Sequence, residues 1–484
     1  MSAANELGSE RAPLRKDVLV KRLFVVLAFL AAHRAYADDG PAAAADDSTG
    51  QVYLKIGEAN VRKSLLALPA LQNQGSSSAA ALRAGKDLFD VVANDLSASG
   101  YFEFVRPGAF LEDVAKVGLK PAPTEANGFK FDTWKQIGAE FLIRAGYRLI
   151  DGKLTLEAYV YDVPQQKLVL GKSYKADAAD VRTMAHTFGN DLVKALTGKR
   201  GFFLSRIVAS RATQPQQKEI YVLDWDGANA RQVTNHKSIA ISPAWAPDAL
   251  SVVYTAFAYH ANEKKRNADL FQFDLATGKR WLLSYRPGIN SGAHFFPDGK
   301  GLALTISQSG NPDIFRMTLD GKSLTRITDG PRGAINVEPS ISPDGKRIAF
   351  SSDRSGQPMI YVMNLDGSNM KRVTFAGQFN SSPAWSPDGK RIAFAGFDAG
   401  HFDLFAMDSD GVNMARLTSS KKPGGKFSNN ESPSFSPDGR LILFASDRTG
   451  VSQLFVVTTD GTTERRITFD QHAYFKPQWS PYLD

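Results

Sequence analysis

The stretch Pro383-Ala384-Trp385-Ser386-Pro387-Asp388-Gly389 is one of six related phrases that decide the fold of this chain. Its Pro-Asp-Gly end is a turn signal, because proline presets φ, aspartate bonds back to the backbone and glycine takes a left-handed conformation. The second prolines of successive copies lie 50, 46, 44, 50 and 44 residues apart. The other copies are Pro243-Ala-Trp-Ala-Pro-Asp248, Ala293-His-Phe-Phe-Pro-Asp298, Pro339-Ser-Ile-Ser-Pro-Asp344, Pro433-Ser-Phe-Ser-Pro-Asp438 and Pro477-Gln-Trp-Ser-Pro-Tyr482.

A period of this length predicts one four-stranded sheet per copy, which is the unit of a β-propeller blade. In the third copy we expect strands at 338–342, 347–351, 359–363 and 371–374, separated by turn-forming residues. The two chain ends are complementary, since 203–234 supplies only the later strands of a unit and 477–481 only the first. The sequence therefore predicts a ring of six blades closed by both ends. The alternative is an open β-solenoid, which does not predict complementary ends.

The composition is that of a globular protein of two or three domains, with 484 residues, 43% hydrophobic and 22% charged. The chain has no cysteine, which excludes disulfides, thiolate metal sites and a cysteine nucleophile. The net charge of +8 is compatible with nucleic-acid binding. However, no Lys/Arg block exceeds three residues and the basic residues are spread through the repeats, so we expect no nucleic-acid partner.

The N-terminus reads as a signal peptide over 1–37. Lys21-Arg22 precede the apolar run Leu23–Ala32, and a small-x-small site places cleavage between Ala37 and Asp38. Ten apolar residues are too few to cross a bilayer, so we expect no direct membrane span. The rival is a buried N-terminal helix. Because residues 1–20 are long for the region before the apolar run, translation starting near Val18 or Val20 is a further hypothesis. Export without cysteine indicates a bacterial periplasmic or secreted protein.

Three segments follow the signal peptide. Residues 38–50 are small and polar and predict a flexible leader. Residues 51–200 predict an α/β domain, a mixed sheet with helices, and 201–484 an all-β six-bladed propeller. The expected strands of the α/β domain are 51–56, 65–68, 141–150, 154–163 and 168–174, and its expected helices are 79–99, 131–138 and 177–197.

Catalytic signatures are missing from the sequence. There is no Gly-x-Ser-x-Gly, His-Glu-x-x-His or P-loop motif. The recurrent Asp-Gly pairs are explained by turn chemistry, and the pairs Asp353-Arg354 and Asp447-Arg448 are expected to form salt bridges within their loops. We therefore expect no catalytic residue, metal or cofactor. The histidines that share no metal-ligand spacing are His186, His236, His260, His294, His401 and His472.

The repeats separate scaffold from candidate site. The aromatic residues at 245, 295, 385, 435 and 479 precede the turn in a fixed place, which favours core between blades over a recognition stripe. The residues before each inner strand are polar and differ between blades, so we expect them to ring the channel mouth with no role in the core. The alternative for any one of them is a solvated turn. The candidates are Asn290, Ser291, Gly292, Asn336, Val337, Glu338, Asn380, Asn430 and Glu431, with Ile289 beside them.

Outside the signal peptide, the chain resembles the TolB family of periplasmic Tol-Pal system proteins of Gram-negative bacteria. The resemblance rests on the repeats and on four other strings: Val92-Ala-Asn-Asp-Leu-Ser-Ala-Ser-Gly100, Lys172-Ser-Tyr-Lys175, Lys194-Ala-Leu-Thr-Gly198 and Trp479-Ser-Pro-Tyr-Leu483. It implies a non-enzymatic, monomeric adaptor that supports outer-membrane integrity and cell division. The implied partners are the lipoprotein Pal, the C-terminal domain of TolA, an outer-membrane lipoprotein and colicins.

The resemblance also implies where these partners bind. Pal is expected at the propeller mouth, around 289–292 and 336–338, and colicins at the same mouth. TolA is expected on the segment Gln51, Val52, Tyr53, Leu54, Lys55, Ile56 and Gly57. Two other function classes remain. A propeller hydrolase requires acid and base groups in the channel, of which Glu338, Glu431 and scattered histidines are the candidates. A carbohydrate-binding module requires aromatic side chains around the mouth.

Overall fold

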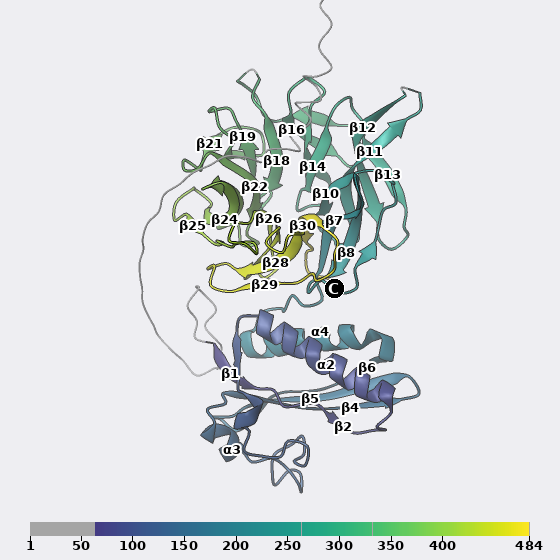
Figure 1. The fold of residues 1–484 in the computed structure, drawn as a ribbon, viewed down its shortest axis with the longest axis vertical. Helices are drawn as coiled ribbons and strands as arrows, with labels where there is room; N and C mark the ends of the chain where they lie inside the picture. Colours follow the sequence, from purple (N-terminus) through teal and green to yellow (C-terminus); the bar gives the residue numbers. More distant parts are fainter. Residues whose placement is uncertain (1–62, 263, 332, 484) are drawn as a thin grey trace, which may run out of the picture.

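The computed structural model describes residues 63–262, 264–331 and 333–483, which form an N-terminal α/β part and a six-bladed β-propeller (Figure 1). Both parts of the expected fold class are confirmed. The signal peptide with its Ala37/Asp38 cleavage site, the leader at 38–50 and the strand at 51–56 lie outside the described residues, as does the expected TolA-binding segment.

A mixed six-stranded sheet underlies the N-terminal part, in the order β3-β1-β4-β5-β6 with β2 paired to β4. β1 runs parallel to β3 and β4, and β4, β5 and β6 are antiparallel neighbours. The β4–β5 turn has Asp151 at φ 48° and Gly152 at φ 75°, the left-handed conformations that a tight Asp-Gly hairpin requires. The strands are β1 (Ser64–Ala67), β2 (Gln72–Asn73), β3 (Phe102–Phe104), β4 (Phe141–Ile150), β5 (Lys153–Asp162) and β6 (Lys167–Asp177).

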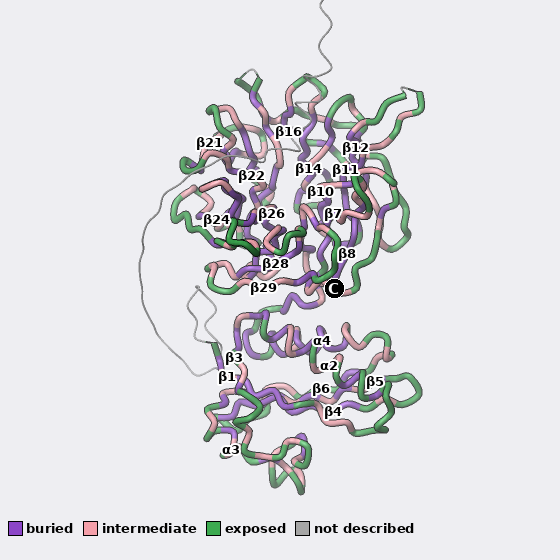
Figure 2. Tube along the Cα trace, viewed as in Figure 1, coloured by how far each residue is buried: buried purple, intermediate pink, exposed green. Residues whose placement is uncertain are grey.

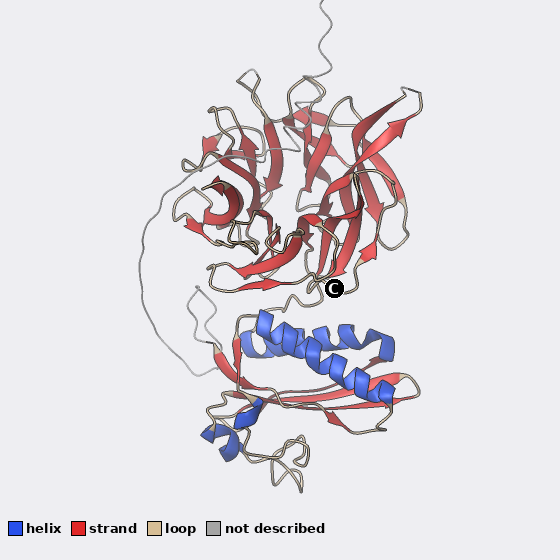
Figure 3. Cartoon of the chain, in the orientation of Figure 1, coloured by secondary structure: helices blue, strands red, loops and turns tan. Residues whose placement is uncertain are grey.

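Two long helices, α2 (Ala79–Ala98) and α4 (Val181–Thr197), cover the face of this sheet that is turned toward the propeller (Figures 1 and 3). Ser78 caps α2 by accepting the Ala81 amide at 3.2 Å, and Gly198 ends α4 at φ 69°. A shorter helix, α3 (Phe131–Gln136), buries Trp134, while η1 (Pro107–Ala109) and η2 (Ala178–Asp180) are single 3₁₀ turns.

The propeller consists of six four-stranded sheets. Blade 1 has β30 (Tyr474–Trp479), β7 (Arg206–Gln214), β8 (Gln217–Asp224) and β9 (Arg231–Gln232). Blade 2 has β10 (Ala240–Trp245), β11 (Ser251–His260), β12 (Lys265–Asp274) and β13 (Arg280–Ser284). Blade 3 has β14 (Asn290–Phe295), β15 (Gly301–Ile306), β16 (Asp313–Thr318) and β17 (Leu324–Arg326).

The remaining blades follow the same order from the inner to the outer strand. Blade 4 has β18 (Asn336–Ile341), β19 (Arg347–Ser352), β20 (Met359–Asn364) and β21 (Lys371–Arg372). Blade 5 has β22 (Phe379–Trp385), β23 (Arg391–Asp398), β24 (His401–Asp408) and β25 (Ala415–Arg416). Blade 6 has β26 (Asn430–Phe435), β27 (Leu441–Ser446), β28 (Gln453–Thr458) and β29 (Glu464–Arg466).

The two ends of the propeller close the ring in one blade. The C-terminal strand β30 pairs antiparallel with β7, with Trp479 opposite Ile207 and Gln478 opposite Val208. The Trp479 indole also donates to the Ser205 hydroxyl at 2.7 Å. The expected closure by complementary ends is confirmed, and the open solenoid is wrong.

The aromatic positions before the turns are buried between blades, as expected. Trp245 of blade 2, for example, packs in one cluster with Val208 and Ile220 of blade 1. Burying such a side chain contributes about 1.5–3 kcal/mol, and six inter-blade seams repeat the arrangement. The repeated phrase is therefore scaffold.

The N-terminal part packs against the turn side of blades 6 and 1. Asp95 of α2 accepts the indole N–H of Trp225 from blade 1 at 3.2 Å and bonds His186 of α4 at 2.8 Å. Arg440, in the turn of blade 6, lies 3.9 Å above the Tyr101 ring. Within the described part of the chain, the N-terminal part therefore lies on this side of the propeller, away from the other mouth of the channel (Figure 1).

We predict that Trp479→Ala lowers the free energy of unfolding of the propeller by about 3–5 kcal/mol, because it empties a buried site in the blade that closes the ring. Phe469→Ala, at a side chain that is 74% exposed, is the control and should cost less than about 1 kcal/mol. Urea unfolding measures both variants when it is followed by far-ultraviolet circular dichroism, because this signal reports the backbone and not the tryptophan that is removed. Equal losses for the two variants would contradict the closure argument.

Candidate binding channel

Each inner strand carries a β-bulge at the same position, and the bulges line the central channel. The pairing of inner and second strands shifts register in all six blades, for example between Val337 and Ser340. One residue in each bulge adopts a positive φ, which turns the backbone locally. These residues immediately precede the first proline or alanine of each phrase, and they are Ser242, Gly292, Glu338, Ser382, Ser432 and Lys476.

A cavity of about 310 Å³ occupies the channel and is lined by residues from all six blades. The six bulge residues line it together with apolar side chains, among them Phe257, Phe379 and Phe475. Such a mixture of apolar walls and a few convergent polar groups is typical of a binding site.

An ion pair crosses the channel. Glu338 belongs to blade 4 and Lys476 to blade 1, which stand opposite each other in a ring of six. The Glu338 carboxylate accepts from Lys476 and, at 2.8 Å, from the amide of Ser382 in blade 5. Lys476 also donates to the Ser382 hydroxyl at 3.0 Å. Three blades are thus linked through one carboxylate.

The two carboxylates of the channel differ in electrostatics. Burial works to raise the pKa of Glu338, but the charge and hydrogen bond of Lys476, with the hydrogen bonds from Ser382, outweigh it and leave the pKa below its ordinary value. Burial raises the pKa of Glu431, Lys476 opposes the rise, and the carboxylates of Asp447 and Glu338 add to it. Glu338 is therefore the ionised partner of the lysine.

The expectation that the mouth residues have no role in the core is wrong for the four asparagines, which are 0–3% exposed. The Asn290 amide donates to the Ala268 and Arg286 carbonyls, at 3.0 and 2.7 Å. Asn336 donates to Asp313 at 2.9 Å. These side chains are buried and satisfy polar groups within the propeller. The asparagines are Asn290, Asn336, Asn380 and Asn430.

The expected loop salt bridges Asp353-Arg354 and Asp447-Arg448 are also wrong in their pairing. Arg354 donates to the Asn336 side chain at 2.8 Å, while Asp353 accepts the Ile335 amide at 2.7 Å. Arg448 likewise donates to Asn430 at 2.9 Å. In blades 4 and 6 the arginine and the aspartate therefore bind different parts of the loop. The arginine is drawn to the buried asparagine, because the side-chain oxygen of the asparagine needs a hydrogen-bond donor.

The other expected mouth residues are brought together at the cavity. Ser291, Gly292, Val337, Glu338 and Glu431 all line it. Ile289 lines it as well, although its side chain is 7% exposed.

Sequence reasoning missed Lys476, together with Lys218 and Phe475, all of which line the cavity. The sequence nevertheless contained a clue to Lys476. The position before the first proline of the phrase varies among the copies, and it is Glu338 in the third copy and Lys476 in the sixth. A ring of six blades places copies that are three repeats apart opposite each other.

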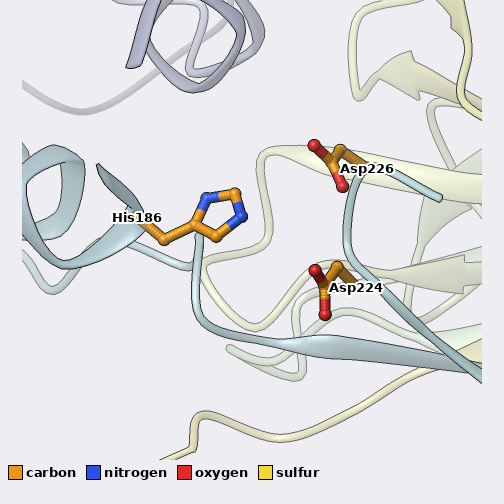
Figure 4. A group of neighbouring side chains, drawn as sticks. All are labelled: His186, Asp224 and Asp226. Carbon is orange, nitrogen blue, oxygen red and sulfur yellow. The ribbon is translucent and has the colours of Figure 1, made fainter. Parts of the chain in front are cut away.

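A group of possible metal ligands lies away from the channel, where α4 meets blade 1. Figure 4 shows the His186 ring directed toward Asp224 and Asp226, and their ligand atoms lie within 4.8 Å of one another. The guanidinium of Arg182 already bonds Asp226 at 2.6 Å and Asp224 at 3.4 Å. The positive charge that a cation would supply is therefore provided by arginine, and the group acts as a contact between the two parts of the chain.

Two family descriptions match the chain. The TolB amino-terminal domain matches residues 52–169, and the TolB β-propeller domain matches residues 193–483. None of the helices in the described part of the chain has the length and hydropathy needed to cross a bilayer.

Curated relatives and a solved structure agree with these matches. The Tol-Pal system protein TolB of Desulfosudis oleivorans is 34% identical over 57% of this chain and 60% of its own length. That of Syntrophotalea carbinolica is 40% identical over 34% of this chain and 37% of its own length. The chain thus aligns with about 60% or less of these two relatives. The crystal structure of TolB from Acinetobacter baumannii superposes with a TM-score of 0.71 and 26% identity, covering 89% of this chain and 100% of that one.

We predict that Lys476→Met destabilises the protein at pH 7 but much less at pH 3. The pKa of Glu338 is lower in the folded protein than in the unfolded chain. The ion pair therefore stabilises the fold fully at pH values above the ordinary pKa of the carboxyl. This stabilisation is lost as the pH falls through the pKa of the folded state. The measurement is the difference in Tm between variant and wild type from pH 7 to pH 3. Lys421→Met, at an exposed lysine, is the control. A difference that stays constant with pH would mean that Lys476 acts through packing alone.

Proposed function

This chain belongs to the TolB family of Tol-Pal system proteins, and from that premise we propose that it is a non-enzymatic adaptor of the periplasm. Its propeller mouth binds the lipoprotein Pal, and the segment 51–57 binds the C-terminal domain of TolA. In this role it supports outer-membrane integrity and constriction during cell division.

The observation that carries the proposal is the channel mouth on the side away from the N-terminal part. All six blades contribute to it, and its apolar walls and bulge residues form a concave surface. Concave surfaces that combine apolar walls with a few convergent polar groups suit ligand binding. A hydrolase would have to work with Glu431 alone of the two candidate carboxylates, because Glu338 is engaged by Lys476 and Ser382. We therefore favour the adaptor over the hydrolase.

The proposed contact surface is smaller than the sequence indicated. It consists of the residues that line the cavity, namely Ser291, Gly292, Val337, Glu338 and Glu431 with Ile289 behind them. The four buried asparagines support this surface from within the blades. Their replacement is expected to affect stability first and binding only as a consequence.

The proposed TolA contact uses strand addition. The sequence of 51–57 alternates between apolar and polar residues, which suits pairing with the edge of a partner's sheet. Lys63, the first described residue, lines a cleft of about 1650 Å³ between the N-terminal part and blades 5 and 6.

We predict that Ser291→Trp weakens binding of purified Pal by about tenfold or more, equivalent to 1.4 kcal/mol, because the indole fills part of the mouth. Ser323→Trp, at an exposed turn on the opposite side of the propeller, is the matched control and should bind like the wild type. Isothermal titration calorimetry measures both. Wild-type affinity in Ser291→Trp would move the Pal site away from the mouth.

We also predict that Pal changes the affinity of the full chain for the TolA domain. If the mouth and the segment 51–57 respond to one conformational equilibrium, the coupling is reciprocal, so TolA changes the affinity for Pal by the same factor. Titrating the TolA domain with and without saturating Pal measures the factor. Equal TolA affinities in the two titrations would rule out the coupling while leaving both binding sites in place.

A further inference from the structure

Blade 2 differs from the other blades in the length of its central hairpin. β11 and β12 have ten residues each, whereas the corresponding strands of blades 3, 4 and 6 have six. At about 3.4 Å per residue, the four additional cross-strand pairs extend the hairpin by roughly 13 Å. Figure 1 shows it projecting, in teal, beyond the side of the propeller that faces away from the N-terminal part.

The projecting hairpin is hydrogen-bonded to the loops on either side. Arg266 donates to the Phe257 carbonyl at 3.1 Å and to the Ser238 hydroxyl at 3.2 Å, which ties the hairpin to the loop before β10. Asn267 accepts the Gly288 amide at 3.1 Å and donates to the Arg286 carbonyl at 2.9 Å, which ties it to the loop after β13. A surface fixed in this way loses little conformational entropy when it binds a partner.

Hairpin and loops together form what we call the cationic arc, residues 213–219, 233–239, 257–269 and 284–289 without 263. Its cations are Lys218, Lys237, Lys264, Lys265, Arg266 and Arg286. Among its described residues the only carboxylates are Glu219 and Asp269, which are 2% and 0% exposed. Both are engaged internally, Glu219 by the Lys237 amide at 2.7 Å and Asp269 by His260 at 2.6 Å. Glu263, at the tip of the hairpin in the sequence, lies outside the described residues.

The arc also exposes aromatic surface and adjoins the channel. Tyr259 and Tyr285 are 58% and 65% exposed, and residues 261, 262, 264 and 265 beside the hairpin tip are exposed as well (Figure 2). Tyrosine and arginine are enriched at protein–protein interfaces. Phe257 and Lys218 of the arc line the channel cavity, so the arc and the mouth form one continuous surface.

We propose that the cationic arc of blade 2 forms part of the docking surface at the mouth. It binds an acidic face of the folded partner that occupies the mouth, and it thereby fixes the orientation of that partner. The proposal rests on the proposed function, in which this partner is Pal. A rigid projection beside a recessed mouth gives a concave outline, which fits the convex surface of a folded protein better than a lipid bilayer. The arc's charge attracts the acidic face during approach, and its tyrosines pack against the docked surface.

The opposite side of the mouth does not share this character. The loop between blades 5 and 6 carries three lysines, but Lys422 pairs with Asp447 at 2.5 Å and Lys421 lies over the Phe427 ring at 5.0 Å. Lys421 and Lys426 are exposed and therefore provide a matched site for charge reversal. If the cationic arc binds the partner, reversing charge on the arc should slow association more than reversing charge on the opposite side of the mouth.

The test measures association of the full mature chain with the purified soluble domain of Pal from the same bacterium, by stopped-flow or surface plasmon resonance. Lys237→Glu with Lys264→Glu reverses two exposed charges of the arc without touching the hydrogen bonds of Arg266. We expect the association rate constant at low ionic strength to fall by about tenfold or more, with little change in dissociation, and the effect to shrink at high salt. Tyr259→Ser should instead accelerate dissociation.

The control is Lys421→Glu with Lys426→Glu, which changes the net charge equally and should alter the association rate by less than about threefold. Wild-type association of the arc variant, or equal slowing by both pairs, overturns the arc while Pal binding at the mouth stands. If the wild type does not bind Pal, the proposed function fails, and the arc as an acidic-partner site fails with it. Pelleting with vesicles of anionic lipid separates the other source of negative charge. If the arc variant loses vesicle binding and keeps Pal binding, the arc is a membrane contact.

Discussion

The backbone pairing of the last strand, β30, with the first propeller strand, β7, is the constraint on which the remaining structure depends. It removes the two open edges that an unclosed array of blades would leave. It also completes the candidate site, because β30 carries Lys476 into the channel opposite Glu338. In this chain, the strand that closes the propeller therefore also supplies a residue of the candidate site.

The polar groups of the propeller divide into two sets with separate duties. The asparagines, with Asp313, Asp403 and the loop arginines, satisfy one another inside the blades, where an unpaired polar group would cost about 1–3 kcal/mol. The bulge residues turn into the channel, where the chemistry of one blade differs from that of the next. The first set has the same structural role in several blades. The second set gives each blade a different side chain at the mouth, which allows the mouth to distinguish between ligands.

The sequence was sufficient for the architecture because the repeat reports it directly. The Pro-Asp-Gly turns, the alternating strands and the complementary ends at 203–234 and 477–481 each have one structural meaning. The asparagines were misassigned because position in a polar loop does not reveal burial, which depends on Ser284, Asp313 and Arg354 folding over them. The contacts of Asp95 and Arg182 with blade 1 were also beyond sequence reasoning, since they join residues about 40 apart or more through packing between two parts of the chain.

The ion pair across the channel has a consequence for selectivity. Lys476 is a cation tethered beside Glu338, so it acts there as a competitor at an effective concentration on the order of millimolar or above. A free cationic ligand, such as a polyamine or a basic peptide, has to displace it before it reaches the carboxylate. A ligand that reaches the carboxylate must therefore displace Lys476 or gain contact area elsewhere on the rim of the mouth.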